Sequence, residues 1–184
     1  MSNNIAIIVG SLRKASFSKK LAKSITGMAP AGFEFKTIPL DDLPIYNQDF
    51  DDEGRVPESY VVFRNAIEAV DGVIFVTPEY NRSIPGVLKN ALDVGSRPYG
   101  KNMWDGKPAA VFSNSPGNIS AFGANHHLRQ CLVFLNVPAM PQPEVYIPAI
   151  NNAFDEAGNL KSEESKAFLQ GAVDAYIDWC NKLK

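Results

Sequence analysis

Short runs made only of apolar residues alternate along this chain with stretches in which apolar residues recur at helical spacing. Residues 5–9 (IAIIV) and 72–77 (GVIFVT) are the clearest of these runs. Continuous apolar runs of this length are typical of strands that are buried on both faces of a parallel sheet. The alternation therefore favours a mostly parallel sheet with helices on both of its faces.

The expected strands and helices follow one another in regular order. Phe17, Leu21, Ile25 and Met28 recur at helical spacing and the pattern stops before Pro30, so a helix is expected after the first strand. Further strands are expected at 34–40, 108–114 and within 137–147, and further helices at 57–70, 87–94, 125–135 and 168–183. Five strands predict one flavodoxin-like α/β domain over residues 1–184, a three-layer doubly wound sheet in the order 2-1-3-4-5. Two long loops, 41–56 and 148–160, are equally well interpreted as functional segments or as solvated insertions.

Charge and cysteine content exclude several classes of partner. Lys and Arg total 18 against 20 for Asp and Glu, and a net charge of -2 offers no global field that would attract nucleic acid or an anionic membrane. Only Cys131 and Cys180 occur, which gives neither a CxxC pattern nor a disulfide framework. No signal peptide or membrane-spanning run is evident, so a cytoplasmic protein is expected.

The loop after the first strand has the composition of an anion site. Residues 10–18 (GSLRKASFS) place serine hydroxyls and Arg13 between a buried strand and the start of a helix, where unpaired N–H groups and the helix dipole favour a negative charge. Neither GxGxxG nor GxxxxGK[ST] is present, so a terminal monophosphate fits better than a dinucleotide or a nucleoside triphosphate. In the alternative interpretation, Ser16 or Ser18 merely caps the helix and Arg13 is a surface charge.

Two further loops follow strands that should end at the same edge of the sheet. Pro78 and Pro85 stiffen residues 77–86, so their main-chain donors and acceptors, with Tyr80 beside them, suit the pyrimidine edge of an isoalloxazine ring. A rigid structural turn is the alternative. Residues 113–118 (SNSPGN) are small enough for close main-chain approach and are expected on the other side of the same ring.

These segments together resemble the NAD(P)H-dependent FMN reductase family. The likeness covers residues 4–147 and is carried by GSLRKxS and TPEYNxSIPGxLKNALD. The resemblance implies bound FMN, with NAD(P)H as the reductant and no resident metal. It implies that the FMN phosphate is held by Ser11, Arg13, Ser16 and Ser18, and the ring by Pro78, Glu79, Tyr80, Asn81 and Ser83, with Ser115 and Gly117 opposite.

The sequence departs from its family at three places. Many relatives carry Asn at the position of Ser18, and many have a Gly-rich stretch followed by arginine where this chain has residues 120–125. Arg82 stands where several relatives have an aromatic residue. It is a candidate substrate-binding residue that would favour anionic acceptors or the NADPH phosphate, although a plain surface arginine fits as well. Arg97, in a segment similar to the family, is a second candidate, and no catalytic side chain is identified.

The function implied by the resemblance is an FMN-dependent NAD(P)H:acceptor oxidoreductase. Hydride would pass to the flavin, the nicotinamide would leave, and quinones or other small oxidants (chromate, ferric chelates, azo compounds or free flavin) would react at the same face, in a ping-pong mechanism. A flavodoxin-type electron carrier and a flavin-binding sensor are the alternatives. A homodimer, or a tetramer, is implied, with the helix after Pro85 and an exposed aromatic segment from Tyr99 to Trp104 at its interface.

Histidine and cysteine side chains are poor candidates for metal or nucleophile chemistry. His126 and His127 are adjacent on a helix and should face different directions, which argues against a shared metal site. Cys131 falls within an apolar helical pattern and is expected to pack in the interior.

Overall fold

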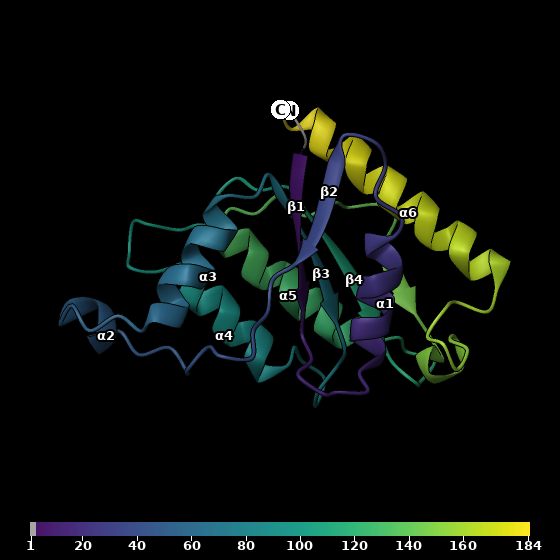
Figure 1. Cartoon of the computed structure of the whole chain (residues 1–184), viewed down its shortest axis with the longest axis horizontal. Helices are drawn as coiled ribbons and strands as arrows, with labels where there is room; N and C mark the ends of the chain where they lie inside the picture. The colour runs from purple at the N-terminus through teal and green to yellow at the C-terminus, as the bar shows by residue number, and fades with distance from the viewer. Residues whose placement is uncertain (1–2) are drawn as a thin grey trace.

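A five-stranded parallel sheet forms the centre of the computed structural model, which describes residues 3–184. The strands lie in the order β2-β1-β3-β4-β5, as predicted (Figure 1). Ile5 of β1 lies opposite Phe35 of β2 on one side and Gly72 of β3 on the other, and Val73 of β3 lies opposite Ala109 of β4. The strands are β1 (Asn3–Val9), β2 (Phe33–Thr37), β3 (Gly72–Thr77), β4 (Ala109–Asn114) and β5 (Val145–Ile147).

Helices cover both faces of this sheet, which confirms the three-layer prediction. On β1, Ile5, Ile7 and Val9 face one hydrophobic core, whereas Ala6 and Ile8 face the other, as the two-residue period of a strand requires. The first core is closed by α1 (Phe17–Thr26) and α6 (Glu163–Lys182). The second is closed by α3 (Glu58–Glu68), α4 (Gly86–Gly95) and α5 (Phe122–Phe134) on the opposite face (Figure 1).

The second strand is shorter than its apolar pattern predicts. It ends at Thr37 instead of Leu40, and the last hydrogen bond to β1 runs from the Ile38 N–H to the Ile7 carbonyl at 3.1 Å. Pro39 has no N–H with which to continue the ladder, so the chain leaves the sheet there.

Both long loops are folded against the domain. Loop 41–56 contains a short helix, α2 (Asp49–Asp52), which is held by a buried bidentate ion pair between Arg64 and Asp51 at 2.7 and 2.8 Å. Loop 148–160 contains a 3-10 turn, η1 (Ile150–Asn152), and Phe154 pairs with Leu160 in an isolated antiparallel bridge. Most residues of both loops are nevertheless exposed, so the choice between a functional segment and a solvated insertion stays open.

The segment from Tyr99 to Trp104 is not the exposed aromatic cluster that the sequence predicts. Trp104 is fully buried, its indole N–H donates to the Leu92 carbonyl at 3.1 Å, and its ring packs against Phe63 and Phe75. Burial of this ring removes a large apolar surface from water, which outweighs anything it would gain at the surface. Tyr99, which is 91% exposed, is the one large aromatic side chain of residues 99–104 that faces solvent.

None of the helices within residues 3–184 combines the length and apolar character needed to cross a bilayer.

Candidate functional site

Loops from three strands meet in one crevice at the carboxyl edge of the sheet. Strand β2 lies on one side of β1 and β3 lies on the other, so the strand order reverses between β1 and β3. Ligands of open α/β sheets bind at such a switch point. The crevice has a volume of about 170 Å³. It is lined by Ser11, Arg13, Ser16, Phe17, Ser18, Pro78, Glu79, Tyr80, Asn114, Ser115, Pro116 and Ile150.

The first side of the crevice is the N-terminal end of α1. Ser16 is the N-cap and its hydroxyl accepts the Lys19 N–H at 3.2 Å, so the capping interpretation of Ser16 is correct in this structure. Arg13 is exposed, donates to the Ala15 carbonyl at 2.7 Å and lies 5.6 Å from the centre of the Phe17 ring. It makes no ion pair with any carboxylate of residues 3–184, and the first turn of α1 holds no acidic residue. This end of the crevice therefore favours an anion.

Ser18 is buried, as are Ser11 and Ser16, and it connects three elements. It is 2% exposed, and its hydroxyl donates to the Asn114 side-chain oxygen at 3.1 Å. The Asn114 amide in turn donates to the Thr77 carbonyl at 3.3 Å. The hydroxyl that was predicted to hold phosphate thus links α1 to the ends of β3 and β4 beneath the crevice.

The loop at residues 78–83, here called the ring-side loop, makes a tight two-residue turn. Tyr80 and Ser83 exchange main-chain hydrogen bonds of 2.9 and 3.0 Å. Asn81 and Arg82 between them have φ values of 50° and 65°, a left-handed conformation that is uncommon for an arginine. Pro78, Glu79 and Tyr80 line the crevice, whereas Asn81, Arg82 and Ser83 do not.

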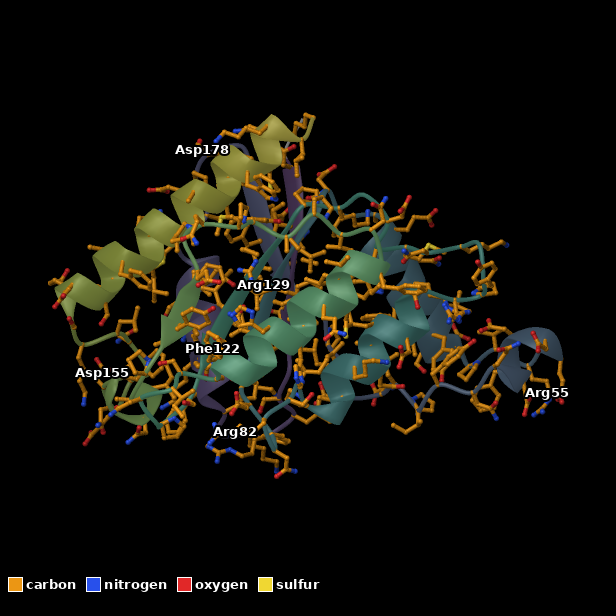
Figure 2. All side chains as sticks on the ribbon, turned by 180° about the vertical axis from the view of Figure 1, so that it is seen from behind. Arg55, Arg82, Phe122, Arg129, Asp155 and Asp178 are labelled. Atoms are coloured by element: carbon orange, nitrogen blue, oxygen red, sulfur yellow. The ribbon has the colours of Figure 1, made fainter. Side chains whose placement is uncertain are left out.

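The Glu79 carboxylate is directed toward α5 and not into the open crevice. One oxygen accepts the Ala124 N–H at 3.1 Å, and the other accepts from the Arg82 guanidinium at 2.9 Å. The side chain of Glu79 is only 10% exposed, whereas that of Arg82 is 71% exposed. Figure 2 shows Arg82 on its loop below the end of α5 at which Phe122 starts the helix. Arg82 is therefore the cation at the rim and Glu79 its anchor.

Of the remaining predicted site residues, Ser115 lines the crevice, whereas Gly117 and Arg97 do not. Ser115 lines the crevice and its hydroxyl donates to the Gly117 carbonyl at 2.9 Å, so Gly117 shapes the turn without lining the crevice itself. Arg97 follows the C-terminal end of α4, and because α4 starts at the carboxyl edge of the sheet and spans about 15 Å, Arg97 lies near the opposite edge. Within one chain it does not reach the crevice.

Sequence reasoning missed four residues that line the crevice. Asn114 had a signal, because it is a polar residue at the very end of an otherwise apolar strand. Phe17 and Pro116 flank predicted site residues directly. Ile150 comes from the loop after β5, and nothing in its local sequence marks it, since only the fold carries that loop to the crevice.

The two adjacent histidines contact different elements, as predicted. His126 lies 3.0 Å from the Tyr146 hydroxyl on β5, and His127 lies 3.0 Å from the Ser83 hydroxyl on the ring-side loop. The pKa of Tyr146 is raised to about 12, mainly by burial and secondly by its hydrogen bond with Glu144. Burial also raises the pKa of the half-buried Cys131 thiol, which fits packing better than nucleophilic chemistry.

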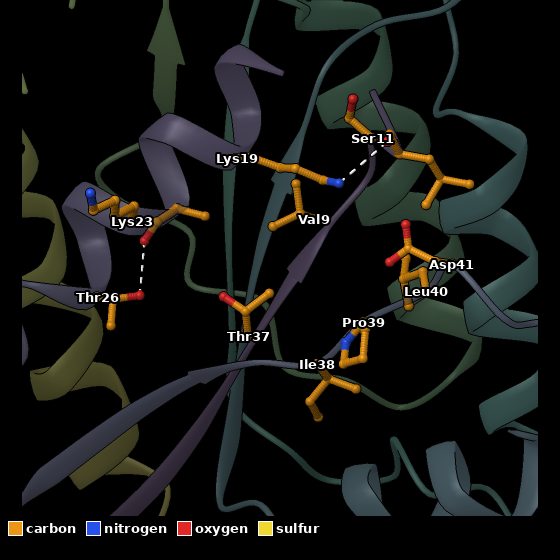
Figure 3. Close-up of a pocket in the computed structure, with 12 residues that line it drawn as sticks. Val9, Ser11, Lys19, Lys23, Thr26, Thr37, Ile38, Pro39, Leu40 and Asp41 are labelled. Atoms are coloured by element: carbon orange, nitrogen blue, oxygen red, sulfur yellow. Dashed lines mark hydrogen bonds between the residues drawn. The ribbon is translucent and has the colours of Figure 1, made fainter. Parts of the chain in front are cut away.

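A larger cavity of about 430 Å³ lies beside the first loop and is a weaker candidate (Figure 3). It opens where β2 leaves the sheet and is bounded by α1 on one side and by residues 37–41 on the other. Lys19 reaches across it and donates to the Leu12 carbonyl at 3.3 Å. This cavity receives nothing from the loops after β3 and β4, so the smaller crevice is the one in which the candidate segments converge.

Comparison with known proteins finds a matching family model and several similar proteins. The family model described as NADPH-dependent FMN reductase matches residues 3–152. A quinone reductase from Pseudomonas putida is 49% identical over 176 residues, which cover 96% of this chain and 94% of that protein. A 2-hydroxy-1,4-benzoquinone reductase from a Burkholderia species is 44% identical over 179 residues, 97% of each chain. The structure of FerB, a flavoenzyme NAD(P)H:(acceptor) oxidoreductase from Paracoccus denitrificans, has a TM-score of 0.91 and 43% identity over 98% of each chain.

Proposed function

This chain belongs to the NADPH-dependent FMN reductase family, and from that premise we propose that it carries two electrons from NAD(P)H through FMN to quinones. It is an oxidoreductase whose flavin is FMN and whose reductant is NAD(P)H. Quinones are the first class of acceptor because two relatives with more than 40% identity are named for quinone reduction. Chromate, ferric chelates, azo compounds and free flavin are further proposed acceptors.

The observation that carries this proposal is the convergence of the three loops in one crevice. We assign the FMN phosphate to the N-terminal end of α1, where Ser11, Arg13, Ser16 and Ser18 lie. A doubly charged phosphate fits there because Arg13 has no carboxylate partner within residues 3–184 and no acidic residue occupies the first turn. We assign the ring to the space between the ring-side loop, with Pro78, Glu79, Tyr80, Asn81 and Ser83, and the turn that contains Ser115 and Gly117.

The protein's part in the reaction is to position the flavin and to leave one face accessible. When bound, FMN supplies the two-electron chemistry that links a hydride donor to an oxidised acceptor. Within residues 3–184 no histidine or lysine lines the crevice, and the Glu79 carboxylate is engaged by Ala124 and Arg82. The proposed reaction requires no side chain as a general acid or base. Tyr80 is 54% exposed at the rim, where Arg82 offers a cation to an anionic acceptor or nucleotide.

Initial-rate kinetics test this function. If donor and acceptor use one face in turn, plots of reciprocal rate against reciprocal NAD(P)H concentration at several fixed quinone concentrations are parallel, and excess quinone inhibits competitively against the nucleotide. Intersecting lines would instead indicate a ternary complex and a separate acceptor pocket. Negligible turnover with every small acceptor by FMN-loaded protein would favour the electron carrier or the sensor.

The assembly that we propose is a homodimer through the face formed by α4 and α5. Val133 and Phe134, near the C-terminal end of α5, are 80% and 82% exposed, and Tyr99 beyond α4 is 91% exposed. Leu92 of α4 and Phe134 line one shallow depression between these helices, which the Lys89–Asp93 ion pair also borders. Exposed aromatic and aliphatic side chains gathered in this way suit an interface between subunits. In such a dimer, Arg97 would act in substrate binding only from the partner's side.

We further propose that residues 1–184 act as one domain in the cytoplasm. Both cysteines are free thiols, and the two hydrophobic cores share a single sheet. A reducing compartment suits such thiols.

A further inference from the structure

We propose that the N-terminal turn of α5 sets the position of the ring-side loop, with Glu79 as the positioning residue that connects the two. The inference rests on the proposed function, since it takes this loop to be a contact of the flavin ring. It differs from the family resemblance in the role of Glu79, a residue that lines the crevice and whose carboxylate contacts the helix.

Helix α5 has no cap of its own. Its N-cap residue is Ala121, which has a left-handed φ of 60° and makes no side-chain capping bond, and Ser120 before it has a φ of 56°. At a usual helix start, a side-chain oxygen of the N-cap accepts the N–H of the second or third helical residue. Ala124 is the third helical residue, and the Glu79 carboxylate accepts its N–H at 3.1 Å.

This contact places a negative charge where the helix favours one. The N-terminal end of a helix carries a partial positive charge, and Glu79 is only 10% exposed, so solvent screens the attraction weakly. Because the carboxylate comes from β3's loop and not from α5, it fastens one element to another. Glu79 thus caps α5 and holds the ring-side loop at the same time.

A second contact fastens the other end of the loop. His127, one turn along α5, lies 3.0 Å from the Ser83 hydroxyl. Between these two contacts, Asn81 and Arg82 keep left-handed conformations that the loop would not favour alone. Two contacts from one helix therefore hold the turn at both of its ends.

The spacing between helix and loop also depends on Gly123. A Cβ atom at this position would lie 2.9 Å from the Arg82 carbonyl oxygen and 3.0 Å from the Glu79 carboxylate. Contacts that short force a shift, so an alanine would push the loop away from α5 without changing any residue of the loop. This provides a way to test the contact from the helix side.

Loosening this contact should affect the ring end of a flavin and not its phosphate end. Riboflavin has the ring without the phosphate, so the two ligands separate the effects. Glu79→Ala and Gly123→Ala should each raise the dissociation constants of FMN and of riboflavin by the same factor, roughly 10-fold, the low end for a lost hydrogen bond to a charged group. Glu79→Gln keeps an oxygen for the Ala124 N–H but loses the acceptor for Arg82. Because Arg82 is 71% exposed and can turn to solvent, the affinity should stay within about threefold of the wild type.

The experiment is equilibrium dialysis of the full chain against each flavin, with visible circular dichroism at saturating FMN as a measure of ring orientation. The matched control is Glu163→Ala, which removes an i,i+3 ion pair to Lys166 whose glutamate is 86% exposed. The two alanine variants in the site should lose dichroism in the flavin bands, whereas Glu79→Gln and the control should retain it.

Unchanged affinity and dichroism in both Glu79→Ala and Gly123→Ala would overturn the proposal. A loss for FMN that riboflavin does not share would also overturn it, because Glu79 would then act at the phosphate. If Glu79→Ala fails to fold, Gly123→Ala decides alone. Failure of the wild type to bind either flavin would instead refute the proposed function.

Discussion

At the scale of single residues, Arg13 carries the sharpest prediction. Its guanidinium lies at the crevice, where the Ala15 carbonyl is its only hydrogen-bond partner within residues 3–184, so a phosphate would gain a charge-assisted bond there. Arg13→Ala should weaken FMN binding about 10- to 150-fold, as expected for loss of roughly 1.5 to 3 kcal/mol. Its riboflavin affinity should stay unchanged, since riboflavin has no phosphate. Fluorescence titration measures both constants, and an unchanged FMN affinity would show that the phosphate lies elsewhere.

The sequence predicts which residues surround the crevice better than it predicts what their side chains do. Ser11, Arg13 and Tyr80 are identified from loops that follow buried strands, and that depends only on local pattern and chain order. The orientation of the Ser18 hydroxyl toward Asn114, and of the Glu79 carboxylate toward Ala124, depends on partners more than 40 residues away. Such contacts are set by the packed fold and leave no local signal.

At the scale of elements, the long apolar strands and amphipathic helices are predictable and the short elements are not. Helix α2 has only four residues, and it is held by the buried ion pair between its Asp51 and Arg64 of α3 and by packing of its Phe50 against the core. Isolated helices of that length are unstable in water. An element this short, held by tertiary contacts, therefore leaves no periodic pattern in the sequence.

That ion pair predicts a pH-dependent stability. The hydrogen bonds from Arg64 hold the pKa of Asp51 below its usual value, so Asp51 contributes stability above the unfolded pKa and loses it as the pH falls through the lower folded pKa. Asp51→Asn leaves a buried guanidinium without its counter-charge and should cost about 3 to 5 kcal/mol at neutral pH. The difference in the free energy of unfolding between this variant and the wild type should become smaller as the pH falls below about 4.

Urea unfolding of the wild type and of Asp51→Asn at several pH values measures this difference in the free energy of unfolding. The neighbouring Asp52 is exposed and lies on the same short helix, so Asp52→Asn is the matched control and should stay close to the wild type. If Asp51→Asn is as stable as the wild type at neutral pH, or if the stability difference keeps its full size in acid, the ion pair with Arg64 does not stabilise the fold as proposed.

For the molecule as a whole, the strand order can be predicted from the alternation of strands and helices. Which apolar side chains stay exposed on the surface cannot be predicted in this way. The prediction placed Trp104 at an interface because aromatic residues are common there, but a ring of that size is equally common in a core. Phe134 and Val133 are among the large apolar residues that do remain exposed, and they belong to a helix whose pattern predicts only its buried side.

The proposed dimer makes a prediction at this scale. Phe134→Glu places a charge in the middle of the proposed interface and should convert a dimer into a monomer of 20.1 kDa, because an unpaired buried charge is costly. Light scattering at micromolar concentration measures the mass. Phe168→Glu, on α6 and the other face of the sheet, is a control that should remain dimeric. A wild-type protein that is already monomeric would refute the interface.

The central claim is that the crevice at the ends of β1, β3 and β4 holds FMN. The most direct measurement is a crystal structure of this protein with FMN. We expect the phosphate at the N-terminal end of α1 within hydrogen-bonding distance of Arg13, and the ring between the ring-side loop and Ser115. FMN bound in the larger cavity beside Lys19 and Lys23, with the smaller crevice filled by solvent, would contradict it.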